Sequence, residues 1–277
     1  MKIKLRATVL LGLAMTLSVS SCSSGLSSDE LKSMKSSLDY KTMTIVLPLD
    51  KYTLSPREAL LIDQANAIVF DGCLQRFGFS DPNAGRDWAT RPVQADRTFG
   101  LWSMDYAEKF GYGIIPDPAG DAINKQFEES IPARNEAWSK CLTEVQFMPT
   151  YRSRSTPLGA SRTVVEEGYR QAYDATEKDS GTKAVIKDWQ ACMKASGLEI
   201  NEEAGFLPVY PPDDIAAQMP IAVIDVKCKE KLLFRQKIGD IEAQYQASYI
   251  GNHEAELLAH RNKANEALEK ARKIVNG

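Results

Sequence analysis

The chain has 277 residues, of which 43% are hydrophobic and 26% are charged, and its formal net charge is −3. The hydrophobic fraction is sufficient for a real core, in one large domain or two small ones. The mildly acidic balance argues against nucleic acid as a partner.

The first 22 residues predict export and attachment to a lipid. Three basic residues among the first six are followed by an apolar run, from residue 7 to residue 17, that is too short to span a bilayer. The order Val-Ser-Ser before Cys22 resembles the bacterial lipobox. It implies cleavage after residue 21 and a diacylglycerol group, of the palmitate type, on the Cys22 thiol. The alternative is an ordinary secretory signal with an incidental cysteine.

We expect the mature chain to be a flexible tether followed by a folded helical domain. The many serines between residues 23 and 37 are typical of a tether. The predicted fold class is mainly α, a disulfide-stapled helical bundle with a long C-terminal helix. The predicted regions are a signal peptide at 1–21, a lipidated and Ser-rich tether at 22–54, and an extracytoplasmic domain at 55–277 with candidate sub-regions 55–149 and 150–277.

The first predicted helix starts at Ser55, because the run Ser-Pro-Arg-Glu has an N-cap residue, a first-turn proline and a capping box. We expect Gly78 to end this helix and residues 79–98, which contain two prolines, to form a loop. Pro132 opens a second helix that places Trp138 and Cys141 one turn apart.

The most aromatic stretch runs from Phe99 to Tyr112. Aromatic residues recur at helical steps of three and four, which fits two interpretations. The stretch is a stripe of core residues on a short helix capped by Ser103, or it is a platform on which a sugar or a flat molecule stacks. The spacing favours the core stripe. The candidate ligand-binding residues of the second interpretation are Phe99, Trp102, Tyr106 and Tyr112.

In the second half, Ser161 is the expected cap of one helix, and another runs from about Thr182 to Gly197. Asp213 or Asp214 caps a third. Residues 221–275 contain no proline and carry an apolar seam like that of a coiled coil. We expect one continuous helix there, with a hairpin turning at residues 251–252 as the alternative.

Four cysteines besides Cys22 predict two disulfides, since an even number in an exported chain is typical of cystine pairs. A metal site would need closely spaced cysteines or accompanying histidines. The cysteines are far apart and the only histidines are His253 and His260, so we expect no metal and no cofactor.

A short internal repeat predicts which cysteines pair. Loop-closure entropy does not distinguish the possible pairings. However, Cys73-Leu74 with a glycine five residues after the cysteine matches Cys192-Met193 with the same spacing. Each half would join this helix to its next cysteine, which gives the pairs Cys73–Cys141 and Cys192–Cys228.

The usual catalytic sets are missing from the sequence, so we expect no enzymatic activity. Both histidines lie on a polar, charge-rich segment, where a solvated surface is the expected role, and no G-x-S-x-G motif exists. Adjacent acids could serve a glycosidase, but such pairs are more often solvated faces or caps. The pairs are Glu166-Glu167, Glu202-Glu203 and Asp213-Asp214.

Several short motifs resemble uncharacterised secreted lipoproteins of actinobacteria. In that family, spaced Cys, Gly and aromatic residues precede a charged C-terminal helix. Here Ser139-Lys140 stands where a glycine usually precedes the third element's cysteine. The resemblance implies an address on the outer face of a Gram-positive membrane, and it supplies no catalytic residues. The motifs are residues 97–101, Tyr112-Gly113, Trp138 to Cys141, Trp189 to Met193, Gly197, and Ile221 to Cys228.

These observations together predict a membrane-anchored, non-enzymatic accessory lipoprotein. Its expected partner is a transporter or envelope protein, bound through the C-terminal helix. The alternative is a lipoprotein that binds a sugar or cell-wall fragment through aromatic residues. A cell-wall hydrolase is the least favoured interpretation.

Overall fold

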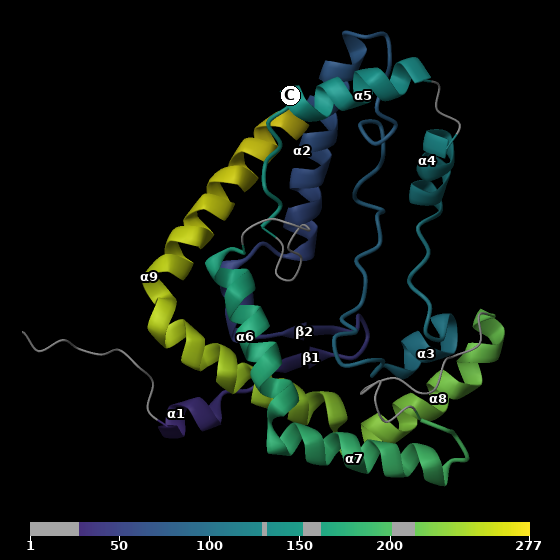
Figure 1. The fold of residues 1–277 in the computed structure, drawn as a ribbon, viewed down its shortest axis with the longest axis vertical. Coiled ribbons are helices and arrows are strands. Elements are labelled where there is room, and N and C mark those ends of the chain that lie inside the picture. The colour runs from purple at the N-terminus through teal and green to yellow at the C-terminus, as the bar shows by residue number, and fades with distance from the viewer. Residues whose placement is uncertain (1–27, 129–131, 152–161, 201–213) are drawn as a thin grey trace, which may run out of the picture.

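The computed structural model describes residues 28–128, 132–151, 162–200 and 214–277. The predicted signal peptide, Cys22 and the predicted cap Ser161 lie outside these ranges, as do residues 201–213. The described chain is mainly helical, as predicted (Figure 1). None of the described helices is both long enough and apolar enough to cross a membrane.

The last helix, α9, contacts α2 from the first half of the chain and α6, α7 and α8 from the second, and the two halves meet again where α3 packs on α8. A two-stranded antiparallel sheet, β1 with β2, precedes them. The elements are α1 (Ser28–Ser33), β1 (Ser37–Asp39), β2 (Thr44–Val46), the 3-10 helix η1 (Pro48–Tyr52), α2 (Pro56–Gln75), α3 (Met104–Phe110), α4 (Pro118–Glu128), α5 (Pro132–Glu144), α6 (Val164–Lys178), α7 (Ser180–Ala195), α8 (Ile215–Leu232) and α9 (Phe234–Asn276).

The prediction of one continuous helix over residues 221–275 is wrong. Leu233 takes a left-handed conformation, with φ 53° and ψ 38°, and separates α8 from α9. The break allows α7 to pack against both helices. The predicted hairpin at residues 251–252 is also not formed. Instead α9 continues through a kink at His253, whose φ is −131° (Figure 1).

The apolar seam of α9 is buried within the chain. Leu257 packs with the core under α6, and further along the helix the seam lies against α2. There it meets Ile62 and Ala65, and all these side chains are buried. The seam residues of this second part are Ala264, Leu268 and Ala271.

The folded part begins before residue 55, so the predicted tether at 22–54 is wrong for most of its described portion. Ser36 donates from its backbone N–H to Asp240 of α9 over 3.0 Å, and Leu49 donates to Gln246 over 2.9 Å. Met43 and the apolar residues from Leu47 to Leu54 are buried. The serine content concealed this packing, because the apolar residues that fix the segment follow the serines.

The helix ends follow the predicted chemistry closely. Ser55 and Glu58 form the predicted capping box, and Asp214 caps α8. Thr163, rather than Ser161, caps α6 by accepting from the Glu166 backbone N–H, and Asp179 caps α7. Helix α4 was not predicted, although Ala119, Ile123 and Phe127 recur in its sequence at steps of four residues.

The structure joins Cys73 to Cys141 and Cys192 to Cys228, as the repeat predicted, with 5.8 Å between the Cα atoms of each pair. The repeat has a local structural basis. Gly78 and Gly197 both have φ near +80°, and the following residue donates five positions back, to Leu74 and Met193 respectively. Helices α2 and α7, which carry the first cysteine of each pair, therefore end in the same Schellman-type cap.

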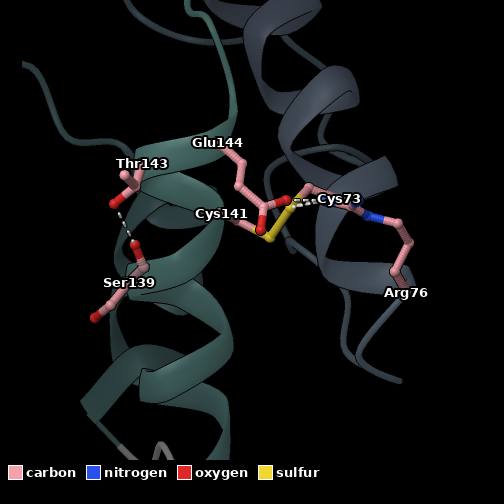
Figure 2. Close-up of a disulfide and its surroundings, with 6 residues drawn as sticks. All are labelled: Cys73, Arg76, Ser139, Cys141, Thr143 and Glu144. Atoms are coloured by element: carbon pink, nitrogen blue, oxygen red, sulfur yellow. Dashed lines mark hydrogen bonds and ion pairs between the residues drawn. A yellow bond between two sulfur atoms is a disulfide. The ribbon is translucent and has the colours of Figure 1, made fainter.

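Figure 2 shows the first disulfide, which staples α5 to α2. Arg76 of α2 donates to the Cys73 sulfur over 2.9 Å and pairs with Glu144 of α5 over 2.5 Å. Both side chains of this ion pair are half exposed, so it adds little to the free energy of folding. The covalent bond and a small apolar cluster hold α5 in place.

A buried charged cluster ties α8 to α7 and to the chain after α3. The Asp225 carboxylate accepts from the Trp189 indole over 2.8 Å and from the Tyr112 hydroxyl over 3.1 Å. It also pairs with Lys229, one turn later, over 3.0 Å. The Lys229 ammonium lies 5.0 Å from the Trp189 ring centre and 5.3 Å from that of Phe234. Asp225 and Lys229 are both fully buried.

Gly168 marks the closest approach of α6 to α9. A Cβ atom at this position would lie 2.6 Å from the Tyr249 ring and 3.0 Å from Leu49. We expect Gly168→Ala to lower the free energy of unfolding by about 1–3 kcal/mol through overpacking. Urea denaturation measures this change.

Gly72 provides the matched control, since it lies inside α2 with no atom within 4 Å of an added Cβ. Gly72→Ala should raise the free energy of unfolding by up to about 1 kcal/mol, through the helix propensity of alanine. Equal effects of the two substitutions would contradict the described approach of α6 and α9.

Candidate functional site

The four aromatic residues predicted to bind a ligand are core residues. Their exposed fractions are at most 8%. Of the four residues, only Tyr106 lies on the short helix α3, which Ser103 caps as predicted. Phe99 and Trp102 precede this helix and Tyr112 follows it, so the helical spacing of the four does not place them on one helix. The Trp102 indole donates to the Asp96 carbonyl over 2.9 Å, and the Tyr112 hydroxyl belongs to the Asp225 cluster. Tyr106 also lines a hollow of about 550 Å³ beside α3, but all four side chains are buried, which favours the core interpretation.

The acids and histidines singled out in the sequence do not form a site in the described structure. Glu166 belongs to the cap of α6, and Glu167 pairs with Arg170. His253 stacks on Tyr249, and His260 meets a tyrosine ring, so both are partly buried rather than fully solvated. Among the described residues, no three His, Cys, Asp or Glu side chains gather as a metal site would require.

A different set of aromatic residues lines an open hollow of about 530 Å³ between α2, α5 and the segments that follow them. We call it the aromatic groove. It has four aromatic rings, an aliphatic rim and a set of polar side chains. Its lining comprises Phe70, Trp88, Trp138 and Phe147; Ala67 and Leu142; and Asp63, Asn66, Asp81, Asn83, Arg91 and Thr150.

Three of the four rings of the groove, those of Phe70, Trp138 and Phe147, form one contiguous surface. Phe70 of α2 contacts the Trp138 ring of α5 edge to face, with 4.5 Å between centres, and lies 5.6 Å from the Phe147 ring. Phe70 is buried, Trp138 is partly exposed, and Phe147 is 40% exposed. Leu142, one turn after Trp138, is 52% exposed. The buried Phe70 ring therefore packs beneath Trp138 and Phe147, which keep part of their surface accessible to a ligand.

The opposite wall of the groove is the loop after α2, which hydrogen bonds hold against that helix. The Asp81 backbone N–H donates to the Asp71 carboxylate over 2.7 Å, and the Trp88 indole donates to the Asn83 carbonyl over 3.0 Å. Arg57 of α2 donates to the carbonyls of residues 89 and 91, each over 3.0 Å. These bonds fix the wall without any ligand, as is usual for a preformed site.

The third border is the chain that follows α5, which Asn66 of α2 holds through a pair of hydrogen bonds. The Asn66 side chain donates to the Met148 carbonyl and accepts from the Met148 backbone N–H, both over 2.9 Å. Phe147 is thereby fixed beside Phe70. The disulfide between Cys73 and Cys141, one turn beyond Phe70 and Trp138 on their helices, holds the same two elements together.

Of the two carboxylates that line the groove, Asp63 forms an ion pair in the described structure and Asp81 does not. Asp63 pairs with Arg91 over 3.5 Å, and the Arg91 guanidinium lies over the Trp88 ring at 5.2 Å from its centre. Burial lowers the pKa of Arg91 and raises the pKa of Asp81. The ion pair at one end leaves Asp81 as the remaining acidic group of the lining.

Another cavity, of about 640 Å³, lies near the start of α2, but structural contacts engage its main charged side chains. Asp50 accepts from the Leu47 backbone N–H over 2.7 Å and from the Tyr169 hydroxyl. Arg97 donates to the Gly113 carbonyl over 2.7 Å, and Arg261 donates to the Thr53 carbonyl. The aromatic groove is therefore the better candidate.

Fold and groove together define a disulfide-stapled helical protein with a preformed aromatic groove on its surface. Comparison of the chain with protein families, with curated proteins and with solved structures finds no match. The candidate function rests on the residues of the groove.

Proposed function

We propose that this protein is an extracytoplasmic, membrane-anchored lipoprotein that binds a sugar or a cell-wall glycan fragment in the aromatic groove. The observation that carries the proposal is the contiguous set of three rings, two of them at least partly exposed, in a groove also lined by carboxylate, amide and guanidinium groups. Aromatic faces stack on sugar rings, and side chains of these polar types hydrogen-bond to hydroxyl groups.

The position of the groove suits a protein anchored at its N-terminus. Helix α1, the first described element, lies in the lower part of Figure 1, whereas the contact between α2 and α5 lies at the top. The α2–α5 contact therefore lies at the far end of the folded part from α1. A ligand in the wall, rather than a lipid of the anchoring bilayer, fits this arrangement.

The groove supports binding better than cleavage. Arg91 pairs with Asp63, and Asp81 accepts two hydrogen bonds from Asn83, so both acids of the groove lining already have partners. The C-terminal helix supports a protein partner less well than the sequence predicted, because its seam is buried against α2. We therefore place the proposed non-enzymatic function in the groove.

Calorimetric titration with chitotetraose and with its fully N-deacetylated form tests the proposal. Trp138→Ala should weaken binding of either sugar by about tenfold, the loss of one stacking contact. Phe77→Ala is the control, since Phe77 follows the end of α2 and is 38% exposed but does not line the groove. Absence of binding by both sugars, or equal losses in both variants, would contradict the proposal. Cleaved sugar after incubation would show a hydrolase instead.

A further inference from the structure

Asp81 is a buried carboxylate with one oxygen still open to a hydrogen-bond donor. It lines the aromatic groove, yet only 6% of the residue is exposed. Its Oδ1 atom accepts from the Asn83 backbone N–H over 2.9 Å and from the Asn83 side-chain amide over 3.1 Å. No residue in the described part of the chain donates to Oδ2.

The surroundings of Asp81 disfavour a negative charge on its carboxyl group. Burial is the largest effect and raises the pKa of Asp81, whereas the two hydrogen bonds from Asn83 lower it. The Asp71 carboxylate raises the pKa and Arg134 of α5 lowers it by smaller amounts, and the net shift is upward. The net effect disfavours the ionised form when nothing is bound. A positive group placed beside Asp81 would offset the desolvation and the repulsion together.

The aromatic walls add to the preference for a cation. The faces of Trp and Phe attract ammonium groups, and this attraction strengthens where water is excluded. The groove already uses this interaction once, between Arg91 and Trp88. Trp138 and Phe147 line the same groove as Asp81, with part of their surface exposed.

From these observations we infer that the groove selects a glycan bearing a free, protonated amine, and that Asp81 is the residue that recognises the amine. This inference rests on the proposed function and names its ligand class. The rings stack on the sugar, and the carboxylate accepts a charge-assisted hydrogen bond from its ammonium group.

The two tetrasaccharides used above differ only in their amino groups, so their affinities isolate this contact. At mildly acidic pH, where the sugar amine is protonated, the deacetylated form should bind about tenfold more tightly than chitotetraose. Asp81→Asn should remove this preference while chitotetraose still binds. Asp87→Asn is the control, because it removes a charge from the same loop at a residue outside the groove lining, and it should retain the preference.

The possible outcomes separate this inference from the proposed function. Equal affinities for the two sugars in the wild-type protein would overturn the role of Asp81 but leave the groove as a glycan site. A preference that survives Asp81→Asn, in a variant with an unchanged melting temperature, would also overturn it. If Asp87→Asn loses the preference for the deacetylated sugar as fully as Asp81→Asn does, the preference comes from the total charge of the loop, and the specific role of Asp81 is overturned.

Discussion

Asp225→Asn should lower the free energy of unfolding by about 3–5 kcal/mol, the largest effect that we expect from a single substitution. Asp225 forms the ion pair with the buried Lys229 ammonium, and it also accepts from Trp189 and Tyr112. Burial already lowers the pKa of Lys229, and Asp225 opposes that shift. Without the carboxylate, the ammonium must be buried with only aromatic rings for compensation, or lose its proton.

Urea denaturation followed by circular dichroism measures the loss. The double variant, Asp225→Asn with Lys229→Met, is the control, since it removes both charges and leaves an amide oxygen for the Trp189 indole. It should be more stable than the single variant, because no uncompensated charge remains. A single variant as stable as the wild type would show that the cluster contributes no net stability.

Replacing Cys73 and Cys141 together by alanine should cost roughly 4 kcal/mol, because this disulfide closes a loop with a sequence separation of 68 residues. Replacing Cys192 and Cys228, which are separated by 36 residues, should also lower the free energy of unfolding. The two losses should differ by well under 1 kcal/mol, with the smaller loss for the shorter loop. The two double variants thus serve as controls for each other.

The functional consequences of the two variants should differ. Loss of the first disulfide frees α5, which carries Trp138 and Leu142, so glycan binding should weaken more than in the second variant. Non-reducing peptide mapping of the wild-type protein checks the pairing itself. A peptide that joins Cys73 to Cys192 would contradict the structure.

Local signals in the sequence were sufficient for the fold class, the disulfides and most helix ends. The capping box at Ser55 and Glu58 acts through neighbouring backbone groups, so it could be read from four residues. The same holds for Gly78 and Gly197, whose positive φ ends two helices in one geometry. The cysteine pairing could be predicted because this repeat marks α2 and α7 as equivalent helices, each joined by a disulfide to the next cysteine in the chain.

Features that depend on distant contacts could not be predicted in this way. The break at Leu233 has no glycine or proline to mark it, and it is favoured because α8 and α9 both pack on α7. The residues of the groove are spread over α2, the loop at 81–91 and the chain from 138 to 150, with no common spacing. Cys141 and Trp138 gave the one usable hint, since a disulfide to Cys73 brings Trp138 to the end of α2.

The most direct test of the account is the response of the four indole N–H signals in a nitrogen-15 NMR spectrum titrated with N-deacetylated chitotetraose. Trp88 and Trp138 line the groove, whereas Trp102 and Trp189 are buried in the core. We expect the signals of Trp88 and Trp138 to shift with added sugar and those of Trp102 and Trp189 to stay in place. A spectrum in which no indole responds, or in which only Trp102 and Trp189 respond, would contradict a glycan site in the aromatic groove.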